Sequence, residues 1–426
     1  MTVLVGGQPT ESATGAAALR CRLCESTSLE TFVDLGATPP CERFLAAHEL
    51  DDPEPTYPLH VRVCRNCLLA QLPPLITPED TFTEYAYFSS FSTSWVNHAE
   101  RFVTAAVDRL GLGRDSFVIE VASNDGYLLQ HAVQRGIRCL GIEPSVNVGQ
   151  AAREVGVPTR TAFLSPELGH DVRNEHGPAD LVVANNVYAH IPDVVGFTQG
   201  LRALVADDGW VSIEVQHLLT LMRHNQFDTV YHEHFQYYTV GSAQRALASG
   251  GLTLVDIETL PTHGGSIRLW ARPAETAGAP STAVVDLLAQ ERAAGLDAVE
   301  GHAGFATAVD GCAPACCGSC SRRSPRARPW SATAHPARAT RCSTTAASAR
   351  TLCSTQWTGT PTSTAASHLA RGSRSTRRSG SIWTARTTSS YSPGPCAPSS
   401  PEQLPHISSW GGRLVFPIPA LEVVAP

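Results

Sequence analysis

Residues 116–145, with the sequence SFVIEVASNDGYLLQHAVQRGIRCLGIEPS, decide the fold. They comprise an apolar strand, a turn of small residues, an amphipathic helix and a second strand that ends at Glu143. This order predicts a βαβ unit, so we expect an α/β fold with a Rossmann-like core. Ligands of such sheets bind beyond the carboxyl ends of the strands. Glu143 follows Glu120 by 23 residues, a spacing at which an acidic side chain can accept both hydroxyl groups of a ribose.

The turn ASNDG, residues 122–126, departs from a dinucleotide-binding turn. Ala122 and Asn124 occupy two positions where glycine lets the backbone approach a pyrophosphate, and only Gly126 remains. A ligand without phosphates is therefore favoured, with S-adenosylmethionine as the candidate, although the pattern alone leaves a dehydrogenase open. The predicted cofactor-binding residues are Glu120, Ala122, Asn124, Asp125, Gly126, Glu143 and Asn185.

Two later stretches predict further strands of the same sheet. Residues 179–197, ADLVVANNVYAHIPDVVGF, begin with a buried strand that ends at Asn185 and Asn186, where the binding crevice is expected. Residues 209–219, GWVSIEVQHLL, carry Glu214 inside an apolar run. A carboxylate in that position indicates a paired side chain rather than a catalytic one.

Four cysteines have the spacing of a metal site. CRLC places Cys21 and Cys24 two residues apart, and CRNC repeats this spacing at Cys64 and Cys67. Two such knuckles complete the tetrahedral four-sulfur shell that structural Zn²⁺ prefers, although buried free thiols are the alternative. The 39-residue spacer must form structure of its own, since LHVRVCRNCLLAQL reads as a strand that runs into the second knuckle.

The stretch FDTVYHEHFQYYT, residues 227–239, concentrates titratable and hydroxyl groups. Metal binding is one interpretation, but alternate residues of a strand point to opposite faces and no third ligand is evident nearby. Proton transfer is another, because a histidine with a pKa near 6.5 can exchange protons at neutral pH. A solvated polar loop is the alternative without function.

Several motifs together resemble one enzyme family, the sugar C-methyltransferases of deoxysugar biosynthesis in antibiotic-producing bacteria. The likeness covers roughly residues 18–310 and follows the family's order. It predicts a zinc-binding domain at 18–80 and a methyltransferase domain at 81–310. The motifs are the paired knuckles, EYAYFSSFSTSW (84–95), IEVASNDGYLL (119–129), ANNVYAHIPD (184–193), YHEHFQYYT (231–239) and HGGSIRLW (263–270).

The resemblance implies a methyltransferase of EC class 2.1.1 that methylates carbon 3 of a nucleotide-linked 4-keto-deoxyhexose, such as a dTDP sugar. Methylation at C5, oxygen or nitrogen stays open, because the shape of the pocket decides it. By similarity His234 is the base, Tyr231 and Glu233 orient the base or the sugar, and Tyr85 and Asn186 line the same pocket. A proton beside a keto group is acidic because the resulting enolate carries its charge on oxygen. S-adenosylmethionine and structural Zn²⁺ are the implied cofactors.

The resemblance also places His263 and Arg268 in a loop near the active site, where a nucleotide phosphate or a structural partner would hold them. No apolar run reaches a membrane span, and the N-terminus lacks the pattern of a signal peptide. We therefore expect a cytoplasmic enzyme, a monomer or a weak dimer, with a nucleotide sugar as its partner and no membrane or nucleic acid.

The composition changes sharply near Gly311. Residues 1–310 carry 19 Arg and 37 acidic residues, whereas residues 311–426 carry 13 Arg and two Glu. From Gly311 to Pro401 there is no acidic residue, no Val and no Phe, so little apolar surface can be buried to offset the conformational entropy. We expect this C-terminal region to be mostly disordered. A zinc-ribbon module with a basic tail for nucleic acid is the alternative function, although the acidic first 310 residues disfavour it.

A change of reading frame explains the tail. Members of the resembled family continue with a domain that contains a stretch close to VGYGAPGKGNTLLNHCGIR. Written in GC-rich codons and read one base late, that stretch becomes SATAHPARATRCSTTAAS, which is residues 331–348 here. The family's own frame returns at Trp410, in WGGRLVFPIPALEVV. We therefore expect residues 311–426 to be a degenerate α/β domain, in which two compensating frame shifts scramble about residues 312–400 and weaken or abolish the activity.

Overall fold

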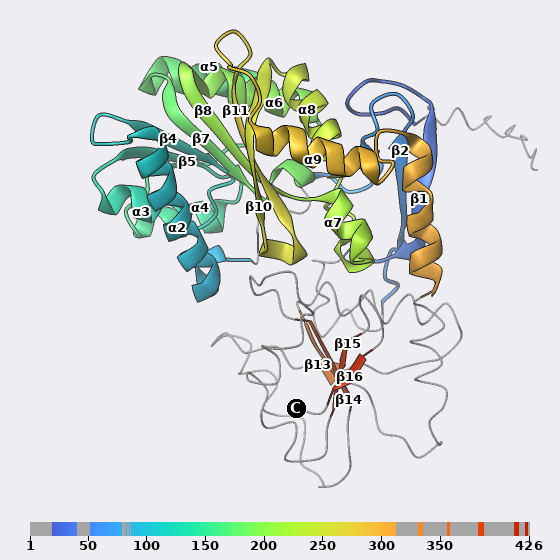
Figure 1. The fold of residues 1–426 in the computed structure, drawn as a ribbon. Helices are drawn as coiled ribbons and strands as arrows, with labels where there is room; N and C mark the ends of the chain where they lie inside the picture. Colours follow the sequence, from blue (N-terminus) through green and yellow to red (C-terminus); the bar gives the residue numbers. More distant parts are fainter. Residues whose placement is uncertain are drawn as a thin grey trace, which may run out of the picture.

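The computed structural model describes residues 19–40, 52–78, 82, 85 and 87–311, together with five short strands in the C-terminal part (Figure 1). Up to residue 311 the described chain forms a large α/β core and a small sheet beside the four paired cysteines. None of the helices in this described part has the length and apolar character of a membrane-crossing segment.

The core is built on a seven-stranded sheet in the order β10-β11-β8-β7-β4-β5-β6. The five strands from β6 to β8 run parallel, and β11 and β10 extend the sheet antiparallel. The chain builds β5 and β6 on one side of β4 and then returns to build β7 and β8 on the other. This reversal opens a crevice at the carboxyl ends of β4 and β7. The strands are β4 (Phe117–Val121), β5 (Arg138–Ile142), β6 (Thr159–Arg160), β7 (Ala179–Asn185), β8 (Val205–Gln216), β10 (Leu252–Leu260) and β11 (Ser266–Pro273).

Helices cover both faces of this sheet. Side chains of α2, α3 and α4 pack with Val118 and Trp270 in one apolar cluster. Side chains of α5, α6, α8 and α9 pack with Ile119 and Ile213 in another, so the central strands β4 and β7 are buried on both faces. The helices are α2 (Thr93–Leu110), α3 (Leu129–Gln134), α4 (Val146–Glu154), α5 (Pro166–His176), α6 (Val194–Leu204), α7 (Leu218–Arg223), α8 (Val240–Ser249) and α9 (Thr282–Ala293).

The small sheet has the order β1-β2-β3-β9 and is antiparallel throughout. Strands β1 (Leu29–Thr38), β2 (Tyr57–Cys64) and β3 (Ala70–Gln71) belong to the cysteine-rich segment, as the sequence predicts for β2. The fourth strand, β9 (Gln236–Tyr237), comes from the histidine- and tyrosine-rich stretch 227–239. The two folded parts of the chain are therefore joined by a shared sheet.

In the C-terminal part, five strands form a sheet in the order β13-β12-β14-β15-β16. The pairs among β12, β13, β14 and β15 are parallel, and β15 pairs antiparallel with β16. The expectations of disorder and of a scrambled domain at 311–426 otherwise concern residues that lie outside the described part. The strands are β12 (Ser331–Ala334), β13 (Gln356–Trp357), β14 (Ile382–Arg386), β15 (Arg413–Phe416) and β16 (Glu422–Val424).

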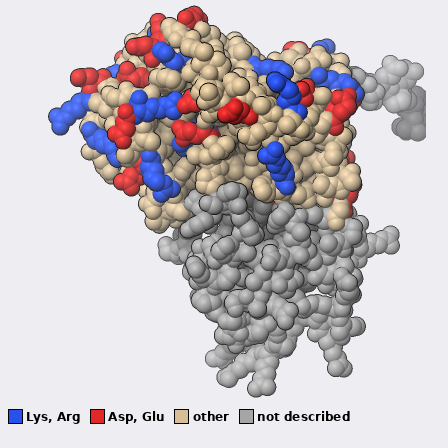
Figure 2. Space-filling view, viewed as in Figure 1, with Lys and Arg blue, Asp and Glu red and all other residues tan. Residues whose placement is uncertain are grey.

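Acidic and basic side chains are interspersed over the described residues on the face shown in Figure 2. The basic ones are all arginine, because the chain contains no lysine. The described residues on this face therefore do not form the cluster of positive charge that nucleic-acid binding uses.

Candidate active site

A cavity of about 840 Å³ lies at the carboxyl ends of β4, β5 and β7. Its wall brings together the turn after β4, the residues that follow β5 and β7, the segment 87–95 and the stretch 231–234. The predicted site residues that line it are Tyr85, Ala122, Asn124, Glu143, Asn185, Asn186, Tyr231, Glu233 and His234.

Glu120 lies beneath this wall rather than in it. Its side chain is buried inside β4, and neither carboxyl oxygen has a hydrogen-bond partner within the described residues. Burial raises the pKa of Glu120 well above its usual value, and the charges of Glu143 and Asp125 raise it further. Burial therefore favours the protonated form of Glu120, which lies beneath the turn.

Asp125 and Gly126 also do not line the cavity, because both serve the turn itself. Asp125 accepts a hydrogen bond at Oδ2 from the backbone of Ser90, at 3.0 Å. Gly126 has a φ of 78°, and a Cβ atom there would lie 2.9 Å from the Cγ2 atom of Val157. The one glycine that remains in the turn is thus needed for a left-handed backbone and for close packing.

Glu143 fixes the shape of the turn after β4. Its two carboxyl oxygens accept hydrogen bonds from the backbone of Asn124, at 2.9 Å, and of Ser145, at 2.8 Å. Burial raises the pKa of Glu143, while these backbone bonds oppose the rise. Each carboxylate oxygen has a second lone pair, so Glu143 can still accept a hydroxyl donor from a ligand in the cavity.

The segment 87–92 closes over the same turn. The backbone of Ser89 donates to Oδ1 of Asn124 at 2.8 Å, and Nδ2 of Asn124 donates to the carbonyl of Tyr87 at 3.2 Å. Asn124 has a φ of 49°, a left-handed conformation that asparagine tolerates better than most residues. The side chain at this position therefore links two loops that a glycine would leave unconnected.

Asn185 and Asn186 follow β7 at the cavity wall. Within the described residues, Oδ1 of Asn185 and Nδ2 of Asn186 are buried and have no hydrogen-bond partner. Asn186 adopts a φ of 54°, and its backbone donates to the carbonyl of Glu214 at 2.7 Å. A buried acceptor and a buried donor that face one cavity suit a polar ligand.

His234 lies among aromatic rings in the cavity wall. Its ring centroid is 3.8 Å from that of Tyr231 and 4.7 Å from that of His190. Its Nδ1 atom lies 3.0 Å from the carbonyl oxygen of Thr229. Because a carbonyl can only accept, Nδ1 carries the proton in the neutral ring and the Nε2 lone pair is the basic one.

His190 is a site residue that sequence reasoning missed. It lies in the stretch after β7, lines the cavity and packs edge-on against His234. Burial lowers the pKa of His190 to about 4, although a hydrogen bond to the backbone of Glu233 opposes the change. Its position after a buried strand could have identified it as a site residue, because polar residues at that edge of a parallel sheet contact the ligand.

The stretch 231–238 does not follow the alternation expected of a strand, because only Gln236–Tyr237 form one. Tyr231, Glu233 and His234 line the cavity, whereas the Nε2 atom of His232 lies 3.0 Å from the carbonyl oxygen of Tyr57 in β2. Among the described residues that could hold a metal ion, the structure groups the four cysteines and no residue of this stretch.

His263 and Arg268 have different environments. His263 lines the cavity, and its ring lies 4.9 Å from that of Trp95. Arg268 is buried in β11, where it binds the carboxylates of Glu214 and Glu258. The structural alternative therefore applies to Arg268, and Glu214 is a paired carboxylate as its position in an apolar strand indicates.

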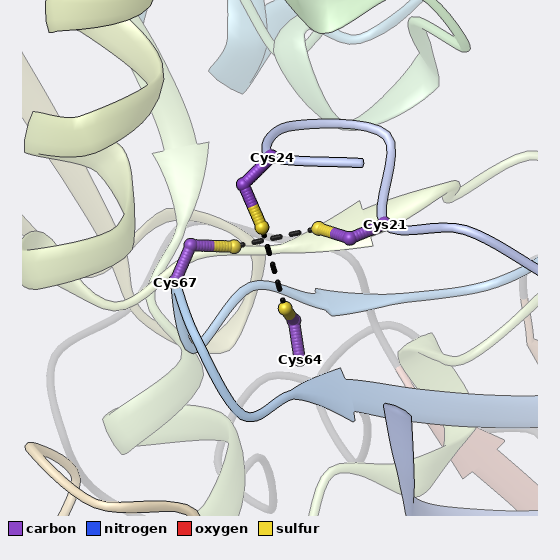
Figure 3. Close-up of side chains that lie close together, drawn as sticks. All are labelled: Cys21, Cys24, Cys64 and Cys67. Atoms are coloured by element: carbon purple, nitrogen blue, oxygen red, sulfur yellow. Dashed lines mark hydrogen bonds between the residues drawn. The ribbon is translucent and has the colours of Figure 1, made fainter. Parts of the chain in front are cut away.

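The four cysteines converge on one point (Figure 3). Their sulfur atoms all lie within 4.8 Å of one another, and the Nε2 atom of Gln71 donates to the sulfur of Cys21 at 3.1 Å. A tetrahedral Zn²⁺ site with bonds of about 2.3 Å places its sulfurs roughly 3.8 Å apart. The cluster therefore fits a structural zinc ion, with four ligands and no open position: Cys21, Cys24, Cys64 and Cys67.

Three sequence families match the chain in order. Residues 21–82 match a family described as "Putative zinc binding domain", and residues 95–257 match one described as "Methyltransferase domain". Residues 261–318 match the "C-methyltransferase C-terminal domain". The chain thus carries these three matches in the order zinc-binding, methyltransferase and C-methyltransferase C-terminal domain. The last match ends at residue 318, shortly after the change in composition near Gly311.

A curated relative agrees with the three domain matches. The chain is 37% identical over 276 residues to the C-methyltransferase NovU of Streptomyces niveus. The match covers 65% of this chain and 66% of NovU, so the chain spans slightly less than two thirds of its relative. Solved methyltransferase structures are similar at lower identity. A methyltransferase from Anabaena variabilis is 17% identical with a TM-score of 0.35, covering 42% of this chain and 86% of that one. One from Clostridium acetobutylicum is 13% identical, also with a TM-score of 0.35, covering 43% and 92%.

The cavity fits S-adenosylmethionine, in agreement with the match to a methyltransferase domain. The turn after β4 presents a short, left-handed backbone without the glycines that a pyrophosphate needs. Glu143 offers acceptors for ribose hydroxyls, and the buried Oδ1 atom of Asn185 offers an acceptor to an ammonium or amino group. These two acceptors are thus suited to a nucleoside with a charged amino-acid tail.

Proposed function

We propose that this chain transfers a methyl group from S-adenosylmethionine to carbon 3 of a nucleotide-linked 4-keto-deoxyhexose. The observation that carries the proposal is a single cavity whose wall holds both Glu143 and His234. A cofactor acceptor and a candidate base thus lie on one enclosed volume, which direct transfer between two bound molecules needs.

His234 is the base in this proposal. Its Nδ1 proton is engaged by the carbonyl of Thr229, so Nε2 takes the proton from the carbon beside the ketone. The electron pair of that C–H bond then moves into an enolate, with the negative charge on the C4 oxygen. When bound, S-adenosylmethionine supplies the electrophilic methyl group that the carbon receives.

The remaining residues hold the enolate and the sugar. Hydroxyl groups of Tyr85 and Tyr231 and the Nδ2 donor of Asn186 line the same wall, where donors stabilise a developing oxyanion. His190 stays neutral at pH 7, because burial lowers its pKa to about 4. Because the ring of His190 is neutral, it does not repel the positive charge that His234 gains when it accepts a proton.

The test is mass spectrometry of a dTDP-4-keto-2,6-dideoxyhexose incubated with S-adenosylmethionine and the protein. We expect the sugar to gain one methylene unit, and NMR to place the new methyl group on carbon 3. His234→Asn should lower the rate by about 10² to 10⁴, the usual contribution of a general base. His224→Asn, at an exposed site on the C-terminal side of α7, is the control and should leave the rate unchanged.

Binding of S-adenosylhomocysteine separates loss of chemistry from loss of the site. Calorimetry should give the same dissociation constant for the His234→Asn variant and the unsubstituted chain. Binding without any transfer by the unsubstituted chain would agree with a lesion in the C-terminal domain. No binding at all would contradict the proposal.

A further inference from the structure

The cysteine cluster and the stretch that carries His234 are joined by a backbone ladder. Strand β3 pairs with β9, so that Ala70 opposes Tyr237 and Gln71 opposes Gln236. The ladder continues where the backbone of Leu72 donates to the carbonyl of Phe235 at 2.8 Å. Phe235 directly follows His234, so the cysteine-rich sheet ends next to the candidate base.

Arg22 adds a side-chain link between the same parts. It lies in the turn between Cys21 and Cys24, and its guanidinium donates to the carbonyl oxygens of Leu72 and, at 3.1 Å, of Pro192. The guanidinium carbon also lies 5.3 Å from the centre of the Phe235 ring. One half-buried side chain thus contacts the stretch with His234 and the loop that follows His190.

Gln71 connects this arrangement to a sulfur ligand. Its Oε1 atom accepts a hydrogen bond from the backbone of Arg22 at 3.0 Å, and its Nε2 atom donates to the sulfur of Cys21 at 3.1 Å. The amide side chain is buried, and its backbone pairs with Gln236 in β9. The position of the first cysteine knuckle is therefore coupled to both catalytic loops through Arg22 and Gln71.

We propose that Arg22 is a positioning residue, which sets the His190 loop and the His234 stretch relative to each other from the first cysteine knuckle. The inference rests on the proposed function for its catalytic consequence. The cysteine cluster then does more than stabilise its own sheet. A shift of about 1 Å at reacting groups can lower a rate by 10²-fold, so a single lost contact of this kind is measurable.

The second knuckle supplies a matched control. Arg65 follows Cys64 as Arg22 follows Cys21, but Arg65 points to the surface and pairs with Glu30 and Glu300. The two arginines have the same place in the same motif, and only Arg22 reaches the cavity loops. Arg22→Met and Arg65→Met therefore change a knuckle equally, and only the first removes the proposed contacts.

The experiment compares the full-length chain with Arg22→Met, Arg22→Lys and Arg65→Met. Zinc content should stay at one ion per chain in all four proteins, and the dissociation constant for S-adenosylhomocysteine should change less than threefold. In Arg22→Met, amide hydrogen exchange should be at least tenfold faster in peptides that cover 188–193 and 231–238. Its kcat should fall about 10- to 100-fold with KM within threefold.

Arg22→Lys keeps the charge but cannot reach both carbonyls while covering the ring, so its exchange should be intermediate. If Arg22→Met does not fold, amide exchange in Arg22→Lys is compared with that in Arg65→Met instead. Exchange in these peptides equal to that of Arg65→Met would overturn the proposal. A full-length chain that does not bind S-adenosylhomocysteine would count against the proposed function, whereas the exchange rates would still decide the role of Arg22.

Discussion

The guanidinium of Arg268 lies 2.7 Å from the carboxylate of Glu214 in the interior of the core sheet. The two residues oppose each other across β11 and β8, and both are buried. Glu214 also accepts hydrogen bonds from His98 and Thr262, at 2.8 and 2.7 Å. Burial raises the pKa of Glu214, but the bond from His98 and the charge of Arg268 outweigh it and hold the pKa at about 2.

Glu214→Gln should destabilise the core, because it leaves the Arg268 cation buried without its closest counter-charge. We expect the free energy of unfolding at pH 7 to fall by roughly 3 kcal/mol, as when one partner of a buried pair is removed. Glu258→Gln removes the more exposed partner of the same arginine and should cost about 1 kcal/mol or less. Denaturant unfolding measures both, and equal losses would contradict the structural role given to Glu214.

Glu143→Gln should weaken the binding of S-adenosylhomocysteine. The amide keeps the size of the side chain but loses the negative charge and one acceptor that a ribose would use. Hydrogen bonds to charged groups contribute about 1.5–3 kcal/mol, so the dissociation constant should rise about 10- to 100-fold. Calorimetry checks this, with Glu154→Gln at the end of α4 as the surface control. An unchanged dissociation constant would remove Glu143 from the binding site.

Local patterns in the sequence predicted the parts of the fold that depend on near neighbours. The strand, turn and helix around residues 116–145 form as the periodicity indicates, and Glu143 directly follows the second strand, which ends at Ile142. The cysteine spacing predicted that the four sulfurs lie together, because two knuckles supply the four ligands of one zinc ion. Asn185 and Asn186 lie at the carboxyl end of their strand, as the rule for parallel sheets requires.

Contacts between distant segments were beyond these patterns. Glu120 has the spacing of a cofactor residue, yet it points into the core beneath the turn, because all five residues of β4 are covered. His190 meets His234 across 44 residues, and β9 joins a sheet whose other strands end at Gln71. A pattern of residue types does not record which loops meet in space.

His190 should make the stability of the protein depend on pH. Its pKa is about 4 in the folded protein and near 6.5 in the unfolded chain, because burial disfavours the charged ring. The unfolded chain therefore takes up the proton first, and stability present above pH 6.5 is lost as the pH falls towards 4. Between pH 7 and 5 this group alone should cost about 2 kcal/mol.

His190→Gln should remove this part of the pH dependence. Denaturant unfolding at pH 7 and pH 5 measures the loss in both proteins, and the difference between the two losses isolates His190. Both proteins share the cysteine cluster and every other titrating group, so these cancel. The same loss in the variant would show that the ring at 190 does not stay neutral on folding.

The last prediction concerns the chain beyond residue 311. From Gly311 to Pro401 the sequence has no acidic residue, no Val and no Phe, and the match to the C-methyltransferase C-terminal domain ends at residue 318. Such a segment offers little apolar surface to bury. Trypsin should therefore cut at its many arginines and leave a stable fragment that includes residue 310 and ends at Arg322, the first arginine beyond it, as mass spectrometry of a timed digest would show.

A chain in which the domain is restored to the family's reading frame is the matched comparison. It should resist trypsin over its full length and should show higher methyl transfer with an unchanged dissociation constant for S-adenosylhomocysteine, because the cofactor cavity lies within residues 78–263. Resistance of the present full-length chain would contradict the prediction. A second isolate that carries the same bases in an unbroken frame would count against an artefact of sequencing as the source of the frame shifts.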